Sequence, residues 1–139
     1  MRTVWLALVY FGCVFGAGLL LGPLRVLLLE PRVGRRAAEL LEMPVMLAVI
    51  ALAAAWIARR VAPDLHASGR LGVGVLATAL VLAADVAVGV ALRGMTVAQV
   101  FTERDPVAGL AFYASLAVCA LAPWYAGRRR RGIAMRRAR

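Results

Sequence analysis

The chain has 139 residues, of which 63 % are hydrophobic, and all 17 of its basic residues are arginine. With 7 acidic residues, the formal net charge is +10. Soluble globular domains are only about 45–50 % apolar, so this composition excludes an ordinary water-soluble domain and indicates an integral membrane protein.

Four apolar segments are long enough to cross a bilayer as helices. They cover residues 3–29, 37–58, 71–92 and 107–126. Because the connections are short, consecutive segments are expected to run antiparallel beside each other. The predicted fold is all-α: residues 1–127 form an integral membrane four-helix bundle with up-down topology, and residues 128–139 form a basic tail.

The first segment carries two glycine pairs with the spacing that lets membrane helices approach closely. At about 100° per residue, Gly12 and Gly16 share one face, whereas Gly18 and Gly22 share another face that continues to Arg25. Arg25 lies roughly 7 Å inside the end of the segment. It either extends to the membrane surface or pairs with an acid on a neighbouring helix.

Residues 30–36 contain Pro and Gly and are predicted to be a non-helical connection. The second segment follows and places Glu39 and Glu42, three residues apart, on nearly the same helical face. Carboxylates within a membrane helix are costly, so they are expected to face the bundle interior, a cavity or a partner. Pro44 lies in the second turn, where it loosens the helix less than at its middle.

Asp85 lies inside the third apolar segment. It shares a helical stripe with Gly74, Thr78 and Gly89, and small and polar residues of this kind are typical of a face turned toward neighbouring helices. The side chain of Asp85 is therefore predicted to point into the bundle.

The connection over residues 93–105 contains a predicted short helix that lies at the membrane interface. Thr96 is a suitable N-cap for it, and Val97 and Val100 lie on its apolar stripe. Asp105-Pro106 then has the form of a helix start, with a capping acid followed by proline at the first helical position.

The distribution of arginine predicts the orientation. Four spans place both termini and the second connection on one side, which carries eleven arginines against six on the other. By the positive-inside rule the N- and C-termini are cytoplasmic, in a multi-pass protein of the cell inner membrane. Trp5, Trp56 and Trp124 all fall at the cytoplasmic ends of their segments, as an interfacial aromatic belt requires.

This topology places the acidic residues in the outer half of the bundle or in its outer connections. The one acid on the cytoplasmic side is Asp64, in the second connection. The predicted outer cluster consists of Arg25, Glu39, Glu42, Asp85 and Tyr113. Its residues lie at similar depths, so all four helices contribute a polar group at one level. Several carboxylates with one cation cannot all be charged cheaply in a low-dielectric site.

Three hypotheses for function follow. The first is a non-enzymatic bundle or assembly protein, in which the cluster holds the helices in register and the small-residue stripes serve a homo-oligomer or a larger membrane complex. The second is a proton- or cation-coupled small transporter that uses Asp85 and Glu42. The third is a lipid-acting membrane enzyme, for which the sequence shows no Ser-His, Cys-His or HExxH arrangement.

No cofactor and no metal site is predicted, because carboxylate spacing alone is weak evidence for a hard cation. Cys13 and Cys119 are expected to be buried free thiols. The tail begins with Arg128, Arg129, Arg130 and Arg131, which are predicted to fix topology and to contact lipid headgroups. Membrane lipids are thus the expected partner, and nucleic acid is the less favoured one.

Overall fold

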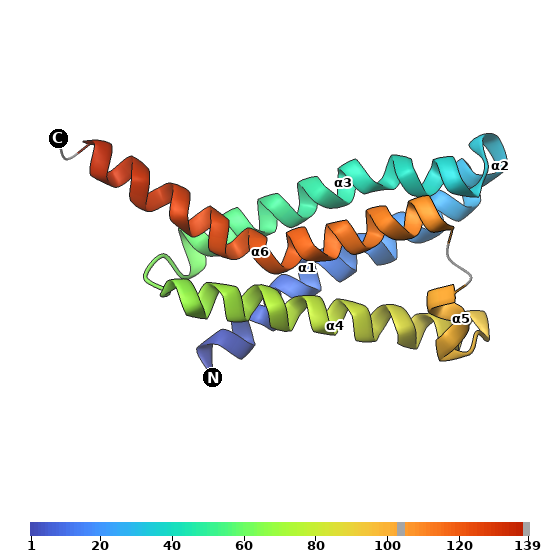
Figure 1. Cartoon of the computed structure of the whole chain (residues 1–139), viewed down its shortest axis with the longest axis horizontal. Coiled ribbons are helices and arrows are strands. Elements are labelled where there is room, and N and C mark those ends of the chain that lie inside the picture. Colours follow the sequence, from blue (N-terminus) through green and yellow to red (C-terminus); the bar gives the residue numbers. More distant parts are fainter. Residues whose placement is uncertain (103–104, 138–139) are drawn as a thin grey trace.

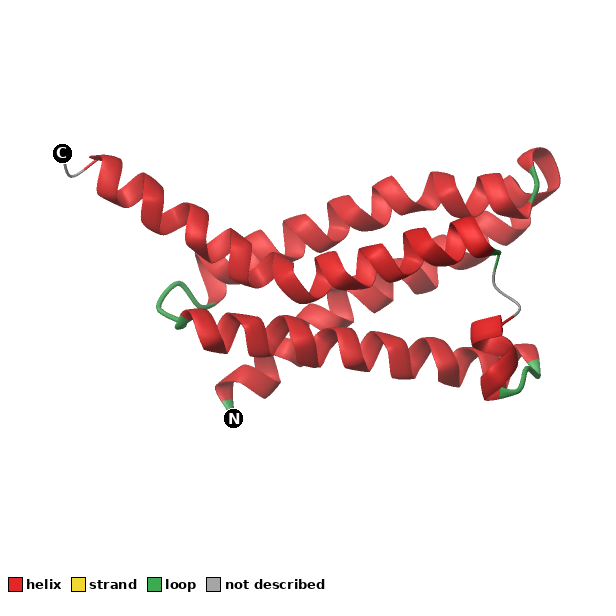
Figure 2. Ribbon diagram, in the orientation of Figure 1, coloured by secondary structure: helices red, strands yellow, loops and turns green. Residues whose placement is uncertain are grey.

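The computed structural model describes residues 1–102 and 105–137, and this part of the chain is helical without strands (Figures 1 and 2). The elements in chain order are α1 (Arg2–Leu24), the π-helical turn η1 (Arg25–Leu29), α2 (Glu30–Val33), α3 (Arg35–Trp56), the π-helical turn η2 (Ile57–Val61), α4 (Ala67–Arg93), α5 (Val97–Thr102) and α6 (Pro106–Arg137). Glu103 and Arg104, which belong to the third predicted connection, lie outside the described residues.

Within the described residues, four helices are long and apolar enough to cross a membrane. They are Arg2–Val33, Arg35–Val61, Ala67–Ala91 and Pro106–Arg128. The all-helical class and the four membrane-crossing helices agree with the prediction from hydrophobic segment length.

Helices α1 and α6 each pack against both α3 and α4. Figure 1 shows both chain termini and the connection between α3 and α4 at one end of the molecule, which we call the termini end. Helices α2 and α5 lie at the other end, which we call the α2/α5 end (Figure 1). The apolar core lies mainly in the termini half of the molecule. Its members from α1 and α4 come from the first half of each helix, and they include Leu6, Tyr10, Val14, Val73 and Ala77.

The connection predicted over residues 30–36 is mostly helical, so that prediction was wrong. Pro31 follows directly on the π-helical turn η1, which is closed by the Glu30 N–H donating to the Arg25 carbonyl, and the helix continues through the proline to Val33. The reversal of the chain is confined to Gly34, whose φ of 80° favours glycine.

The capping signals before α5 and α6 are confirmed. The Thr96 hydroxyl accepts the Gln99 N–H at 3.2 Å, and the Gln99 side chain accepts the Thr96 N–H at 2.7 Å, which forms a capping box. Asp105 accepts the N–H groups of Val107 and Ala108 at 3.0 Å each. These hydrogen bonds, that of Ala108 first, lower the pKa of the Asp105 carboxyl.

A buried tyrosine ties three helices together near the middle of the bundle. Proline has no N–H, so Pro123 leaves the carbonyl of Cys119, four residues earlier, without its usual helical donor. The Tyr10 hydroxyl lies 3.2 Å from that carbonyl and 3.5 Å from the carbonyl of Ile50 on α3. Tyr10 is fully buried, so its hydroxyl satisfies a backbone group that water does not reach.

Helix α6 does not end near residue 126 but continues to Arg137 and projects from the termini end (Figure 1). The guanidinium carbon of Arg128 lies 4.1 Å from the centre of the Trp124 ring, within range of a cation–π interaction. The side chains of Arg129, Arg130 and Arg131 lie outside the described part of the structure.

The link between Tyr10 and Pro123 can be tested by a double-mutant cycle. Tyr10→Phe keeps the ring but removes the donor, and we expect it to lower the free energy of unfolding in detergent by about 1 kcal/mol. In a Pro123→Ala background the helix supplies an N–H to the Cys119 carbonyl, so the same substitution is expected to cost clearly less. An equal cost in both backgrounds would contradict this role of Tyr10.

A polar cavity at the α2/α5 end as candidate functional site

A cavity of about 780 Å³ lies between the spans and extends from the α2/α5 end toward Cys119. Residues of α1, η1, α2, α3, α4, α5 and α6 all line it. Most of these side chains are apolar, and among the larger ones are Phe15, Met43, Met46, Ile50 and Phe112. Four residues of the predicted outer cluster line it as well: Arg25, Glu39, Glu42 and Asp85.

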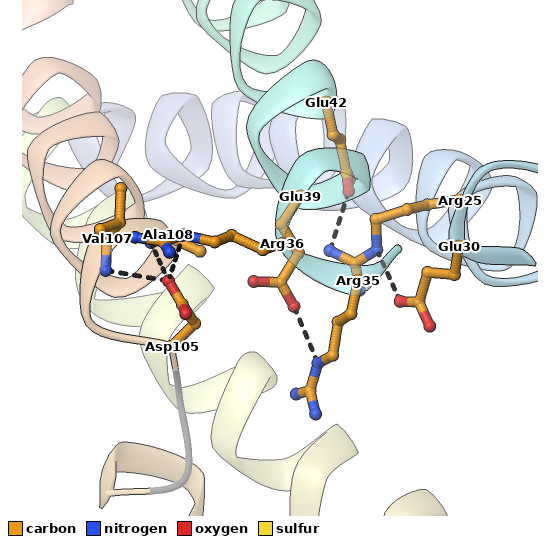
Figure 3. Close-up of polar contacts among 9 residues, drawn as sticks. All are labelled: Arg25, Glu30, Arg35, Arg36, Glu39, Glu42, Asp105, Val107 and Ala108. Atoms are coloured by element: carbon orange, nitrogen blue, oxygen red, sulfur yellow. Dashed lines mark hydrogen bonds and ion pairs between the residues drawn. The ribbon is translucent and has the colours of Figure 1, made fainter. Parts of the chain in front are cut away.

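Arg25 contacts two carboxylates of the cavity wall, those of Glu42 and Glu30, as Figure 3 shows. It is the first residue of η1, and its Nη1 donates to Oε2 of Glu42 on α3 at 3.0 Å. Its Nε lies 3.5 Å from Oε1 of Glu30. The side chains of Arg25 and Glu42 are only 20 % and 10 % exposed, so this ion pair joins the first and second spans inside the bundle.

Glu39 is paired with a different arginine. Arg35 Nε lies 3.2 Å from Oε1 of Glu39, one helical turn away on α3, as Figure 3 shows. The Glu39 residue is 9 % exposed, whereas the Arg35 side chain is 55 % exposed. The arginine therefore reaches inward from the end of the bundle to a buried carboxylate.

A further ion pair connects the starts of α3 and α6. Arg36 Nε lies 3.4 Å from Oδ1 of Asp105, the residue that also caps α6. The Arg36 side chain is 59 % exposed, so the pair is open to solvent and contributes little to stability.

Asp85 lines the cavity from α4, and the stripe predicted around it faces the bundle. The added Cβ of an alanine at Gly74 would collide with the Ala120 carbonyl on α6, and one at Gly89 would lie 2.6 Å from Val100 of α5. The Thr78 hydroxyl lies 3.5 Å from the Leu116 carbonyl of α6. These close approaches are what small and polar residues permit between membrane helices.

Tyr113 does not line the cavity, so its predicted place in the outer cluster is not what the structure gives. Its residue is 43 % exposed, and its ring lies 5.6 Å from that of Phe112 in an edge-on arrangement. The neighbours Phe112 and Ser115 line the cavity in its place. Tyr113 lies on the exposed side of α6, because the buried side of this helix includes Ala108, Ser115 and Cys119.

Two residues of the wall were missing from the prediction, namely Glu30 and Arg35. Both were assigned to a connection that proved helical, and helix brings them back toward the bundle. The i,i+4 spacing of Arg35 and Glu39 was the signal that would have revealed the ion pair between them.

Among the side chains that the structure describes, the ionisable ones that line the cavity are four acids and two arginines: Glu30, Glu39, Glu42, Asp85, Arg25 and Arg35. Their formal charge is −2 when all are ionised. Among the described residues, no three His, Cys, Asp or Glu side chains are grouped so that they could hold a metal ion. The described side chains form a mostly apolar cavity wall that includes several carboxylates.

Neither a protein-family model, nor a curated protein, nor a solved structure matches this chain.

Proposed function

We propose that this chain is a multi-pass protein of the cell inner membrane, folded as an antiparallel four-helix bundle with both termini in the cytoplasm. The α2/α5 end then faces outward. The excess of arginine near the termini end supports this orientation by the positive-inside rule. Trp5 and Trp56, 59 % and 48 % exposed, belong to the ends of their helices on that side, where interfacial aromatic residues are expected.

The short helix α5 is proposed to lie at the outer interface. Its Val100 is buried against Gly89 of α4, whereas Val97 and Phe101 are exposed and available to the lipid boundary. Polar groups of the same helix, such as Gln99, then remain in water.

The function that the geometry supports best is non-enzymatic binding of a small molecule in the outer cavity, as part of proton- or cation-coupled transport. The observation that carries it is the combination of a cavity of about 780 Å³, apolar walls and ionisable groups from several spans. Small-molecule sites commonly have this size and this mixture of apolar and convergent polar residues. Asp85 and Glu42 are the proposed coupling groups, because intramembrane carboxylates are the usual proton carriers.

The hypothesis of a lipid-acting enzyme receives less support from the cavity. Its lining includes no histidine, and the hydroxyl of Ser115 donates to the Phe112 carbonyl of its own helix at 2.7 Å. A serine nucleophile would need a base within hydrogen-bond reach.

Accessibility of single cysteines tests the outward-facing cavity. With Cys13 and Cys119 replaced by alanine, cysteine is introduced at Asp85, which lines the cavity, or at Ala87, an exposed residue of the same helix outside it. We expect a membrane-impermeant thiol reagent added to intact cells to label Asp85→Cys but not Ala87→Cys, because a thiol in lipid stays protonated and unreactive.

A further variant, His66→Cys at the termini end, is expected to react only after the membrane is permeabilised. Ser115→Cys, a smaller chemical change in the same cavity, replaces Asp85→Cys if that variant does not accumulate. Labelling of His66→Cys in intact cells would overturn the orientation, and absence of cavity labelling from either side would overturn the site.

Self-association through α1 is a second candidate function, and the surroundings of its glycines favour it. An added Cβ at Gly12 or Gly16 would have nothing within 4 Å, and Cys13 between them is exposed rather than buried as predicted. Gly18 and Gly22, in contrast, line the cavity. A small-residue pair that the bundle does not use is available to a second copy or to a larger complex.

Substitution of Gly12 and Gly16, the glycines on the outer surface of α1, tests this second function. Gly12→Leu with Gly16→Leu is expected to shift the protein toward monomers by at least about tenfold in sedimentation experiments in mild detergent, because leucine prevents close approach of the backbones. Ala87→Leu, a change of similar size at an exposed position of α4, serves as the control. A wild-type protein that is monomeric in native membranes would exclude this function.

A further inference from the structure

Carboxylate and guanidinium side chains are separated from apolar ones along the length of the cavity. Those that line it lie in the half of the bundle toward the α2/α5 end: Arg25, Glu30, Arg35, Glu39, Glu42 and Asp85. The described wall toward Cys119 is apolar apart from the Ser115 hydroxyl, and it includes Val14, Phe15, Met46, Ile50 and Leu116. A ligand that matches this order is amphipathic, with its polar part toward the α2/α5 end.

The length of the cavity matches one leaflet of a bilayer. Its wall on α3 extends from Arg35, the first residue of that helix, to Ile50. At about 1.5 Å per residue, this distance is about 22 Å. Half of a bilayer with its headgroup region is roughly 20–22 Å thick, of which about 15 Å is hydrocarbon. A lipid of the leaflet at the α2/α5 end therefore has its polar and apolar parts in the same order and over a similar length.

The cavity wall continues into the lipid-facing surface of the first span. Leu19 and Leu27 line the cavity, yet both are more than half exposed, and they belong to the first membrane-crossing helix. Between them, an added Cβ at Gly22 would have no described atom of a neighbouring element within 4 Å. Exposed leucines of a span contact lipid chains, which are as apolar as leucine itself. The cavity is therefore accessible from the bilayer beside the second half of α1.

We propose that the cavity takes up one hydrocarbon chain of a membrane lipid, which enters sideways past the second half of α1. The lipid comes from the leaflet at the α2/α5 end, its headgroup lies beside the ionisable residues, and its chain extends toward Cys119. This inference rests on the proposed function, binding of a small molecule in the outer cavity, and adds the chemical class of that molecule and its route of entry.

The inner part of the cavity suits a hydrocarbon chain better than water. A bound water needs two to four polar partners. The Ser115 hydroxyl in this part of the wall already donates to the Phe112 carbonyl at 2.7 Å. A hydrocarbon chain needs no such partners, and the flexible thioether of Met46 adapts to its shape.

The volume of the cavity is also sufficient for such a ligand. At about 780 Å³ it is within the roughly 300–1,000 Å³ of small-molecule sites. Transfer of a chain from the bilayer into an apolar cavity gains little hydrophobic energy, because both surroundings are apolar. Polar contacts of the headgroup with the ionisable residues therefore determine which lipid binds.

Tryptophan fluorescence in vesicles of brominated lipid tests this inference, because bromine on a lipid chain quenches tryptophan by contact. The native tryptophans are first changed to phenylalanine: Trp5, Trp56 and Trp124. Phe112→Trp then places a reporter in the cavity wall, and Leu20→Trp places one on the exposed surface of α1 outside the cavity. We expect phosphatidylcholine with brominated chains to quench Phe112→Trp at least about half as much as Leu20→Trp, because both then contact hydrocarbon.

A second substitution shows whether the chain reaches the reporter through the cavity. Gly22→Phe places a ring in the space beside α1, and we expect it to reduce the quenching of Phe112→Trp at least about twofold, because the ring occupies space that the chain would use. The control is Ala87→Phe, at an exposed position of α4 outside the cavity, which is expected to leave the quenching unchanged. Phe15→Trp, also in the cavity wall, replaces Phe112→Trp if that variant does not fold.

The outcomes distinguish this inference from the proposed function. If acrylamide in the aqueous phase quenches the cavity reporter but brominated lipid does not, the cavity holds water, and the lipid inference is wrong while the proposed function is supported. If Gly22→Phe leaves the quenching by brominated lipid unchanged, the chain contacts the reporter from outside the cavity, which also contradicts the inference. If neither quencher reaches the reporter, the cavity is closed to lipid and to water, and both the inference and the proposed function are overturned.

Discussion

The ion pair between Arg25 and Glu42 is the interaction on which the α2/α5 half of the molecule depends. A charged residue at the centre of a membrane helix costs about 2.5–3.5 kcal/mol by insertion scales, so neither side chain belongs in lipid alone. The hydrogen bond of 3.0 Å between them places both charges inside the bundle and thereby orients the first span against the second. Glu30 and the Arg35–Glu39 pair extend this polar surface, which becomes one side of the cavity.

The two halves of the bundle therefore use different means of holding helices together. The termini half has an apolar core and a buried polar contact, in which Tyr10 donates to the carbonyl that Pro123 leaves without a helical partner. The other half replaces apolar contacts with ion pairs and a cavity. Packing in the first half supplies rigidity, and the second half retains space and charge.

Sequence patterns predicted the features that depend on composition and local spacing. Segment length gave the four membrane-crossing helices, the Asp105-Pro106 pair gave the start of α6, and the stripe containing Gly74 and Asp85 gave the inward face of α4. Features that depend on tertiary packing could not be predicted from local sequence patterns. Tyr113 lies outside the cavity because the neighbouring helices determine which side of α6 is buried. The hydroxyl that compensates for the missing N–H of Pro123 belongs to Tyr10, more than a hundred residues away in the chain.

The most direct test of the account is a double-mutant cycle at the Arg25–Glu42 pair, measured as reversible unfolding in detergent micelles. Arg25→Met keeps much of the apolar stem, and Glu42→Gln keeps the shape of the carboxylate, so each single variant leaves one charge without its main partner. We expect each single change to be destabilising and the double variant to lose at least about 1 kcal/mol less than the sum of the two single losses. Additive losses would show that the two side chains do not hold the spans together, and would contradict the account.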